Sequence, residues 1–177
     1  MRKTVVKPSA VIRPATPEDL KAVAEISAHY VTHSVATFDE TPRAMTDWQR
    51  WLDELTGRGL PFLVADMPGG VAGYAYAGPW RPKPAYRYTV EDTIYVAPDH
   101  IGQGLGTALL GTLVTRSTEA GMRQMIAVIA DTGDPGSATL HSRFGFVETG
   151  RLTGVGFKHG RSIDTTLMQR PLRPAPA

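Results

Sequence analysis

The chain has 177 residues, a formal net charge of +2 and no cysteine, and 42% of its residues are apolar. This length and composition fit one compact domain, since single domains most often contain roughly 100 to 150 residues and can be longer. The balanced charge disfavours a nucleic-acid or membrane-surface binder, and the absence of cysteine excludes disulfides, thiolate metal sites and thiol nucleophiles.

The two ends of the chain carry no pattern of a folded element. Near the N-terminus the longest apolar stretch is Val5-Val6, whereas a secretory signal needs roughly 7 to 15 apolar residues. We therefore expect a flexible leader at 1–10, one domain at 11–170, and a tail at 171–177 that is too rich in proline to pack. No apolar run approaches the ~18 residues of a membrane-spanning helix, so we expect a soluble, cytoplasmic protein.

The first elements are a short strand and two helices. The strand is predicted at 11–13, and Thr16 and Pro17 then have the residue types of an N-cap and a first helical position. A second helix is predicted from Thr46 as N-cap to Gly57. Its apolar residues recur with helical spacing at Trp48, Trp51, Leu52 and Leu55.

An irregular stretch at 33–42 separates these helices, and strands follow the second one. Residues 62–65 and 71–77 predict an antiparallel hairpin around a Pro-Gly-Gly turn. A proline-rich loop at 78–84 has too many fixed φ angles for a regular element. The segment 89–96, rich in β-branched and aromatic residues, predicts the next strand.

The second half alternates helices and strands. Helical spacing of apolar residues predicts a helix at 105–116, and the fully apolar segment 125–130 predicts a strand buried on both faces. A short helix at 137–144 precedes two strands at 146–152 and 163–169. The order β-α-α-β-β-β-α-β-α-β-β predicts a mixed α/β sheet in a single domain.

Three alternating glycines, Gly102, Gly104 and Gly106, lie between a predicted strand and a predicted helix. Backbone N–H groups in such a loop surround an anion and the helix N-terminus adds positive charge, which favours a phosphate or pyrophosphate. No lysine follows Gly106, so the loop is not a Walker A motif, and the third glycine falls one residue early for a Rossmann fingerprint. A dinucleotide site with Asp131 on the ribose, or a turn that only caps the helix, stay as alternatives.

The segment Val96–Leu110 resembles motif A of the GNAT acetyltransferase superfamily, whose R/Q-x-x-G-x-G/A loop binds the pyrophosphate of acetyl-CoA. Within that superfamily the chain is similar to the phosphinothricin and methionine sulfoximine N-acetyltransferases. The matching segments are Thr37–Pro42, Trp80–Pro82, Thr89–Val96, Leu140-His141 with Phe144–Phe146, and Gly154–Arg161. The resemblance implies a GNAT-type domain, with a mostly antiparallel central sheet of six to seven strands and four flanking helices. It also implies a homodimer.

The resemblance also implies that acetyl-CoA, as co-substrate, lies beside the strand at 94–96 with its pyrophosphate on the glycine loop. The implied cofactor-binding residues are Ile94, Tyr95, Val96, Gly102, Gln103, Gly104, Leu105, Gly106, Thr107, Asp134 and Ser137. Three positions depart from the family pattern: Ile101 replaces the usual Arg or Gln, Asp134 replaces Asn, and Ser162 replaces Trp. Asp134 can only accept hydrogen bonds when ionised. Ser137 contacts the coenzyme or caps its helix, and capping is the favoured reading.

For catalysis, the resemblance implies direct attack of an amine on the thioester. An ammonium must first lose a proton, and Glu91 is the candidate base. A backbone N–H near Tyr95 or Val96 is the candidate donor to the oxyanion, and His141 is the candidate acid for the leaving thiolate. Two alternatives stay open, because a strand glutamate facing water and a histidine on a helix surface would give the same pattern.

For the acceptor, the resemblance implies a small amino acid, and an aromatic and cationic loop offers groups that would bind its anionic end. The candidate substrate-binding residues are Phe38, Arg81, Pro82, Lys83 and Tyr86. The five histidines show no H-E-x-x-H spacing, so no metal is expected. Two alternatives remain: an N-acetyltransferase for a different small amine, and a non-catalytic acyl-CoA sensor.

Overall fold

The computed structural model describes residues 10–173, and in this range the chain forms one seven-stranded sheet with four α-helices. The strands are β1 (Val11–Pro14), β2 (Phe62–Met67), β3 (Gly70–Pro79), β4 (Thr89–Val96), β5 (Gln124–Ala130), β6 (Val147–Lys158) and β7 (Arg161–Pro171). The helices are α1 (Leu20–His33), α2 (Met45–Gly57), α3 (Leu105–Glu119) and α4 (Gly136–Arg143). This order of strands and helices confirms the sequence prediction.

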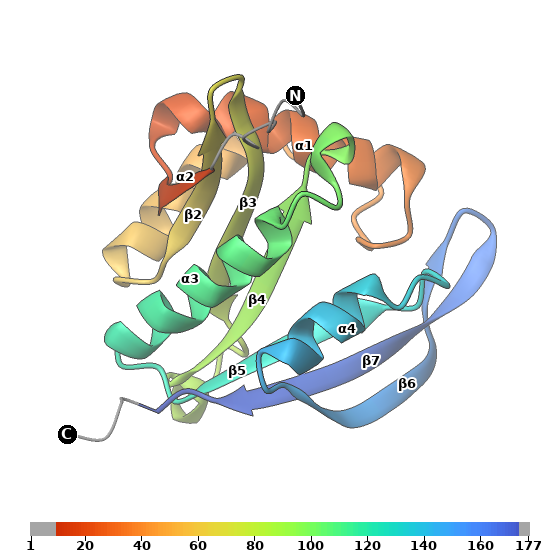
Figure 1. The fold of residues 1–177 in the computed structure, drawn as a ribbon. Helices are drawn as coiled ribbons and strands as arrows, with labels where there is room; N and C mark the ends of the chain where they lie inside the picture. Colours follow the sequence, from red (N-terminus) through yellow and green to blue (C-terminus); the bar gives the residue numbers. More distant parts are fainter. Residues whose placement is uncertain (1–9, 174–177) are drawn as a thin grey trace, which may run out of the picture.

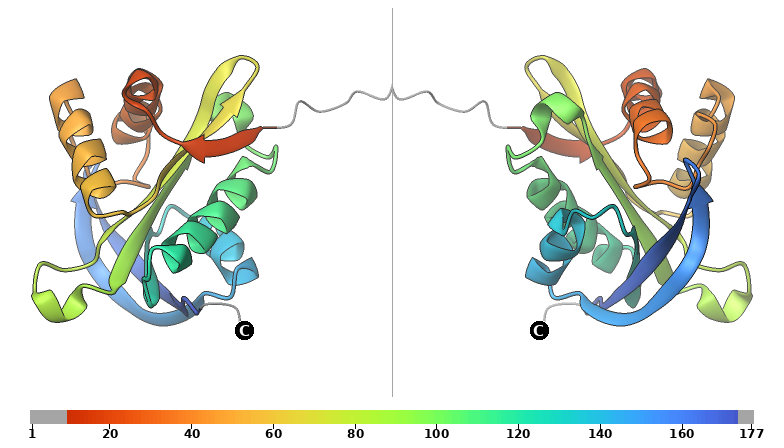
Figure 2. Two further views of the ribbon diagram at one scale, coloured as in Figure 1. Left: turned by 90° about the vertical axis from the view of Figure 1, so that its left-hand side faces the viewer. Right: turned by 90° about the vertical axis from the view of Figure 1, so that its right-hand side faces the viewer.

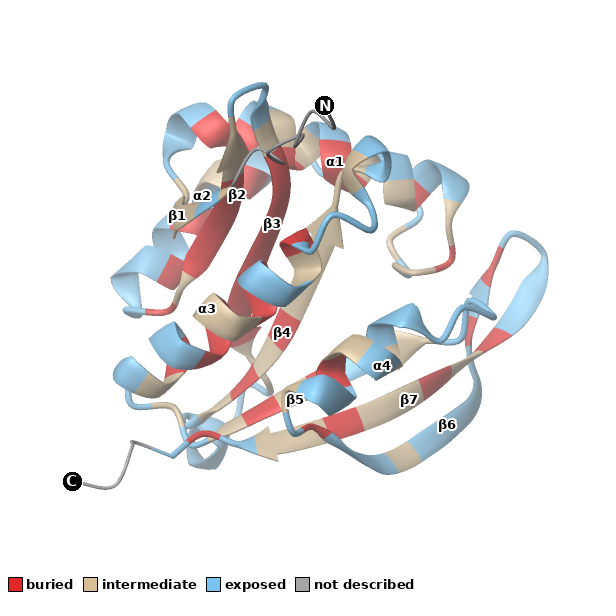
Figure 3. Cartoon of the chain, viewed as in Figure 1, coloured by how far each residue is buried: buried red, intermediate tan, exposed pale blue. Residues whose placement is uncertain are grey.

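The helices cover both faces of the sheet. Helices α1 and α2 lie on one face and α3 and α4 on the other (Figures 1 and 2). The core is densest around β2 and β3, where Figure 3 shows the longest buried stretches. Trp48 of α2, Tyr74 of β3 and Leu109 of α3 are each at most 1% exposed. The aromatic and aliphatic stripes of these three elements therefore form one continuous core.

The strands of the sheet follow the order β1-β2-β3-β4-β5-β7-β6, and the two middle strands, β4 and β5, pair over only part of their length. Every neighbouring pair is antiparallel except β4 and β5, which run parallel. The parallel ladder pairs only Thr89–Glu91 with Gln124–Ile126, after which the two strands diverge. The mostly antiparallel sheet is as predicted, but two-sided burial of β5 is wrong: Val128 is 40% exposed, because it faces the space left by this divergence.

One of two predicted helix starts is confirmed and the other differs. Thr16 is the N-cap of a short 3-10 turn at Pro17–Asp19, as predicted, and α1 continues from this turn at Leu20. Helix α2 begins at Met45, so Thr46 does not cap it. The carbonyl of Ala44 accepts the first helical hydrogen bonds, and no side chain of the described part of the chain caps this end.

The C-terminal hairpin is longer than predicted, with 12 residues in β6 and 11 in β7. The register with β7 shifts between Glu148 and Gly150 and again between Leu152 and Gly156, and β6 continues past its predicted end at residue 152. Pro171 still belongs to β7, and Leu172 is 3% exposed with its N–H donating to the Arg123 carbonyl at 2.8 Å. The prediction that the tail does not pack is therefore wrong at these two residues. The expected leader up to residue 9 and the tail from residue 174 lie outside the described range.

Across residues 10–173, none of the helices combines the length and the hydropathy needed to cross a membrane.

Candidate active site

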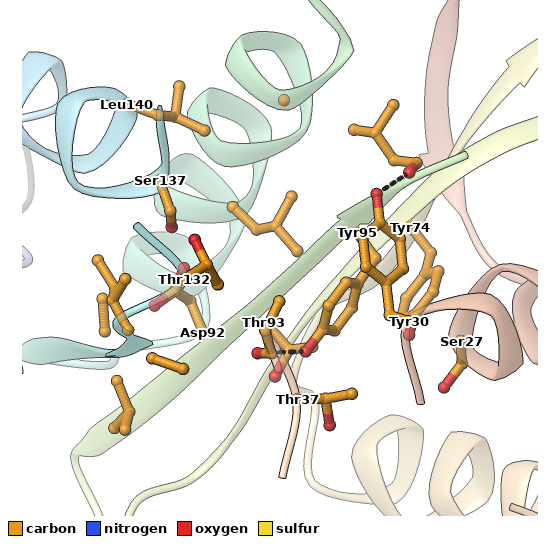
Figure 4. Close-up of a pocket in the computed structure, with 18 of the residues that line it drawn as sticks. Ser27, Tyr30, Thr37, Tyr74, Asp92, Thr93, Tyr95, Thr132, Ser137 and Leu140 are labelled. Atoms are coloured by element: carbon orange, nitrogen blue, oxygen red, sulfur yellow. Dashed lines mark hydrogen bonds between the residues drawn. The ribbon is translucent and has the colours of Figure 1, made fainter. Parts of the chain in front are cut away.

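A cavity of about 600 Å³ opens where β4 and β5 diverge. Its volume is in the usual range for small-molecule sites, roughly 300 to 1,000 Å³. Its walls come from α1, the segment 36–43, strands β3, β4 and β5, and helix α4. The close-up in Figure 4 shows tyrosines on one side of β4, and Asp92, Thr132, Ser137 and Leu140 on the other.

The far end of β4 presents a free edge to this cavity. The Ala97 N–H bonds to Ala72 of β3, and the Trp80 N–H bonds to the Thr89 carbonyl. Because backbone groups alternate in direction along a strand, those of Tyr95 also point to β3, whereas those of Ile94 and Val96 point to the open edge. Ile94 and Val96 can therefore offer main-chain N–H groups to a ligand beside β4.

One acceptor on this edge already has a partner. The Tyr30 hydroxyl donates to the Val96 carbonyl at 2.6 Å (Figure 4). The Tyr95 hydroxyl crosses to the opposite wall and donates to the Ala36 carbonyl at 3.3 Å. Burial raises the pKa of Tyr95 to about 12, so the phenol keeps its proton at neutral pH. The two tyrosines tie α1 and the segment 36–43 to β4.

The glycine loop ends at the N-terminus of α3. Gly102 and Gly104 have φ values of 78° and 86°, which residues other than glycine rarely adopt, and Gly104 is the N-cap residue. Among residues 10–173, no side chain caps this end of the helix, so its first N–H groups are available to an anion. A free strand edge beside an uncapped helix N-terminus fits the pantetheine amides and the pyrophosphate of acetyl-CoA.

Few residues of the glycine loop at 101–106 face the cavity. Ile101 lines the cavity and is 64% exposed, and Gly106 lines it where α3 approaches Leu140 of α4. Leu105 belongs to the core. The Gln103 amide turns back and donates to the Asp99 carbonyl at 3.2 Å.

The loop before α4 carries the two other predicted coenzyme residues. Both Asp134 and Ser137 line the cavity. Asp134 Oδ1 accepts the N–H of Gly136 at 2.9 Å and so satisfies the start of α4. Ser137 is the second residue of the helix, so the prediction that it caps α4 is wrong. The carboxylate that replaces the family's usual asparagine thus acts as a backbone acceptor.

Glu91 is half-buried in the cavity wall. Burial raises the pKa of Glu91 above its ordinary value, the nearby charge of Asp92 raises it further, and Arg81 opposes both effects. The alternative of a strand glutamate that simply faces water does not describe this position. A carboxylate with a raised pKa in a cleft suits proton abstraction.

His141 is buried, with 4% exposure, and the alternative of a surface histidine is wrong. Its Nε2 lies 2.7 Å from Oδ2 of Asp92, and its Nδ1 lies 2.7 Å from the Ser137 carbonyl. Asp92 was not among the predicted site residues. The signal was present in the strand alternation, which places Asp92 on the apolar face with Val90 and Ile94, where a carboxylate needs a buried partner.

The predicted substrate residues do not come together. Phe38 lines the cavity, whereas the others lie exposed outside its wall: Arg81, Pro82, Lys83 and Tyr86. Strand β3 runs on to Pro79, and a 3-10 turn at Pro84–Tyr86 then holds this loop beyond the cavity. The Arg81 guanidinium lies 4.9 Å above the Trp80 ring and reaches the site only through its charge effect on Glu91.

The acceptor side of the cavity is instead aromatic with one cation. Tyr30, Tyr74 and Tyr95 pack together, with ring centroids 4.9 and 5.7 Å from Tyr95. Within the described chain, Arg43 is the only arginine or lysine lining the cavity; it pairs with Asp39 at 3.5 Å and lies 5.1 Å over the Trp48 ring. Periodicity could not find Arg43, because it belongs to the irregular stretch before α2.

Comparison with known proteins gives consistent matches. Residues 12–167 match the acetyltransferase (GNAT) domain family. A phosphinothricin N-acetyltransferase of Alcaligenes faecalis is 46% identical over 164 residues, covering 93% of this chain and 83% of that protein. An L-methionine sulfoximine/L-methionine sulfone acetyltransferase of Pseudomonas paraeruginosa is 41% identical over 167 residues, covering 94% and 96%. A phosphinothricin acetyltransferase from Sinorhizobium meliloti, crystallised with acetyl-CoA, superposes with a TM-score of 0.89 at 45% identity, covering 93% and 89%.

The fold and the cavity define an enzyme that transfers an acetyl group from acetyl-CoA. Related structures contain acetyl-CoA, and the free edge of β4 and the glycine loop fit it. The chain belongs to the GNAT acetyltransferase family. The resemblance drawn from the glycine loop is thereby confirmed, and the dinucleotide alternative is wrong.

Proposed function

We propose that this enzyme acetylates the α-amine of a small amino acid of the phosphinothricin or methionine sulfoximine/sulfone type. The observation that carries the proposal is a half-buried carboxylate, Glu91, in an aromatic cavity beside the free edge of β4. The relatives named for these substrates support the substrate class. Arg43 is the cation placed to attract the acid group of such an acceptor.

In the proposed reaction, Glu91 takes a proton from the ammonium, directly or through one water, so that nitrogen gains a lone pair. The amine then attacks the thioester carbonyl without a covalent enzyme intermediate. The N–H of Val96 is directed to the open edge of β4 and donates to the developing oxyanion; loss of such a donor typically costs about 3 to 4 kcal/mol. Tyr95 does not serve as this donor, since its N–H points to β3. His141 supplies a proton to the departing thiolate.

The test measures coenzyme A release with acetyl-CoA and, in separate reactions, phosphinothricin, methionine sulfoximine, methionine sulfone and spermidine. We expect turnover with the three amino acids, and a loss of about 100-fold or more in Glu91→Gln because base catalysis contributes roughly 10²–10⁴-fold. Turnover with spermidine alone would indicate a different small amine. Coenzyme binding without turnover on any amine would support an acyl-CoA sensor and overturn the proposal.

We also propose that two copies associate through the edge strand β6. Exposed apolar side chains cluster along it, with Phe157 70% and Val155 56% exposed, and unpaired sheet edges of this kind favour pairing with another chain. Multi-angle light scattering at micromolar concentration should give the mass of a dimer, and Phe157→Asp should shift it toward the monomer. A monomer in the unchanged protein would contradict the proposal.

A further inference from the structure

The buried pair of Asp92 and His141 joins β4 to α4 beneath the cavity. Side-chain exposure is 3% for Asp92 and 5% for His141, and both residues line the cavity. Figure 4 shows Asp92 directed toward the α4 side of β4. The second carboxylate oxygen, Oδ1, is buried and has no hydrogen-bond partner in the described protein. Burying a carboxylate oxygen without a hydrogen-bond partner costs free energy, so packing alone does not explain this arrangement.

The contacts of the imidazole fix how many protons the pair holds. Nδ1 faces the Ser137 carbonyl, which can only accept, so Nδ1 carries a hydrogen. Nε2 faces Oδ2 of Asp92 at 2.7 Å, and two lone pairs cannot meet at that distance, so a second proton lies between them. The pair therefore holds two protons and no net charge. Because an imidazole ordinarily binds a proton more tightly than a carboxylate does, both protons belong to the ring, as imidazolium beside carboxylate.

We propose that Asp92 is a positioning residue that keeps His141 doubly protonated, so that the histidine enters each catalytic cycle already carrying the proton for the leaving group. This inference rests on the proposed function for its chemistry, but not for the protonation state itself. Without the carboxylate, the same ring in the same pocket would hold one proton, on Nδ1, and would have none to give.

The proton balance of the proposed step is simple. When the carbon–sulfur bond breaks, the departing thiolate forms an S–H bond with the proton shared by Nε2 and Oδ2. This leaves a neutral imidazole, still donating from Nδ1 to Ser137, beside the Asp92 carboxylate, and the facing lone pairs of Nε2 and Oδ2 make this state short-lived. One proton from water then reloads the pair. The amine nitrogen loses two protons in all, the first to Glu91 before attack and the second to solvent as the tetrahedral intermediate collapses, so the complete reaction releases one proton.

Several groups act on this ring in different directions. Burial lowers the pKa of His141, but the hydrogen bond and the charge of Asp92, with the Ser137 carbonyl, outweigh burial and raise it. Phe146 packs edge-on with ring centroids 5.0 Å apart and carries no charge. Glu91, next to Asp92 in β4, is the other titrating group nearby, and by strand alternation it faces the opposite side of the sheet.

The decisive variant is Asp92→Asn, whose amide can donate to Nε2 and thereby leave His141 neutral. Nitrogen NMR of the imidazole at pH 7 should show both ring nitrogens protonated in the unchanged protein and only Nδ1 protonated in the variant. A singly protonated His141 in the unchanged protein would overturn the proposal, whatever the acceptor proves to be. Because this measurement needs no substrate, failure of the inference and failure of the proposed function can be told apart.

Kinetics supply a second readout. In Asp92→Asn we expect kcat to fall about 10- to 100-fold, with the KM for acetyl-CoA and the KM for the amine nearly unchanged. The pH above which kcat declines should be lower in the variant by at least one pH unit. Adding Asp92→Asn to His141→Gln should cost less than 2-fold more, because Asp92 acts only through the histidine. Asp53→Asn, on the exposed face of α2, is the matched control. Independent, multiplying losses from the two variants, or an unmoved alkaline limb, would contradict the inference.

Discussion

The ring of Phe38 occupies the space that a side chain on Gly156 would need. A Cβ at this position in β6 would overlap three ring carbons of Phe38, which lines the acceptor side of the cavity. Lys158 of the same strand is 3% exposed and donates from Nζ to the Thr37 carbonyl at 2.8 Å. Strand β6 therefore holds the segment that carries Phe38.

We expect Gly156→Ala to displace Phe38 and raise the KM for the amine by about 10-fold, because small displacements in a binding site lower activity strongly. The KM for acetyl-CoA should stay within 2-fold, since the residues proposed to bind the coenzyme lie on the other side of β4. Gly150→Ala is the matched control, because a Cβ there meets no atom within 4 Å. Equal effects of the two variants in steady-state kinetics would contradict a specific role for the contact between Gly156 and Phe38.

At the scale of residues, the sequence was informative where periodicity applied. Alternation along 89–96 correctly separated Glu91 and Tyr95 from Asp92, although it could not say that Asp92 had a histidine partner in α4. Arg43 was missed, and Arg81 was expected in the cavity but lies outside it. Both arginines belong to irregular segments, where side-chain direction depends on tertiary contacts that no local pattern encodes.

At the scale of elements, the start of α1 is tied to the first hairpin by an ionic network. Arg13 of β1 donates to Asp19 at 2.7 Å and, through Nε, to Asp66 of β2 at 2.9 Å. Asp19 also accepts the N–H of Thr16 at 2.8 Å. The hydrogen bond from Arg13 lowers the pKa of Asp19 below its ordinary value, burial opposes this, and Thr16 adds to it.

A carboxyl whose pKa is lowered on folding contributes stability at neutral pH and loses it as pH falls through the folded pKa. We expect Asp19→Asn to lower the free energy of unfolding by about 2 kcal/mol at pH 7, typical of a lost charged hydrogen bond. The difference from the unchanged protein should shrink as pH falls below about 4. Urea unfolding at pH 7 and at a pH below about 4 measures the difference in free energy of unfolding, and Asp53→Asn on the exposed face of α2 is the control. A difference independent of pH would contradict the ionic origin.

The kinds of element were predictable, but several boundaries were not. All four α-helices were predicted, and helical spacing located the three longer ones, because amphipathic helices carry their buried stripe in the sequence. The start of α2 and the true length of β6 were missed. In the first case a backbone carbonyl replaces the side-chain cap, and in the second the partner strand β7 carries the ladder past glycines that usually end a strand. Which strand pairs with which depends on contacts between distant parts of the chain, and a local sequence pattern does not contain it.

At the scale of the whole molecule, the predicted burial of β5 on both faces was wrong, because β4 and β5 pair over only part of their length. A fully apolar strand indicated burial on both faces of β5. The divergence from β4 after three residue pairs exposes Val128 to the cavity. The apolar run in β5 therefore serves partly as a wall for a ligand, and composition alone does not distinguish that use from a core strand.

Because Ile94 and Val96 direct their N–H groups to this gap and Tyr95 directs its own to β3, ligand binding should affect adjacent residues differently. We expect acetyl-CoA to slow hydrogen exchange at Ile94 and Val96 by about 10-fold or more, while exchange at Tyr95 changes far less. Exchange measured by NMR with and without the coenzyme tests this. Uniform protection of all three amides would indicate a general stabilisation, and not the filling of a strand edge.

The short ladder between β4 and β5 also bears on how much folded enzyme a cell would hold. Only three residue pairs join β4 to β5, and a ligand that spans the gap adds contacts to both strands where they no longer pair with each other. A ligand at 100 times its Kd stabilises the folded state by about 2.7 kcal/mol. Changes of about 1–2 kcal/mol are enough to alter protein abundance several-fold through turnover of unfolded chains. The lifetime of this enzyme is therefore expected to follow the supply of acetyl-CoA, so that the protein persists when its acetyl donor is plentiful and is cleared when the donor is scarce.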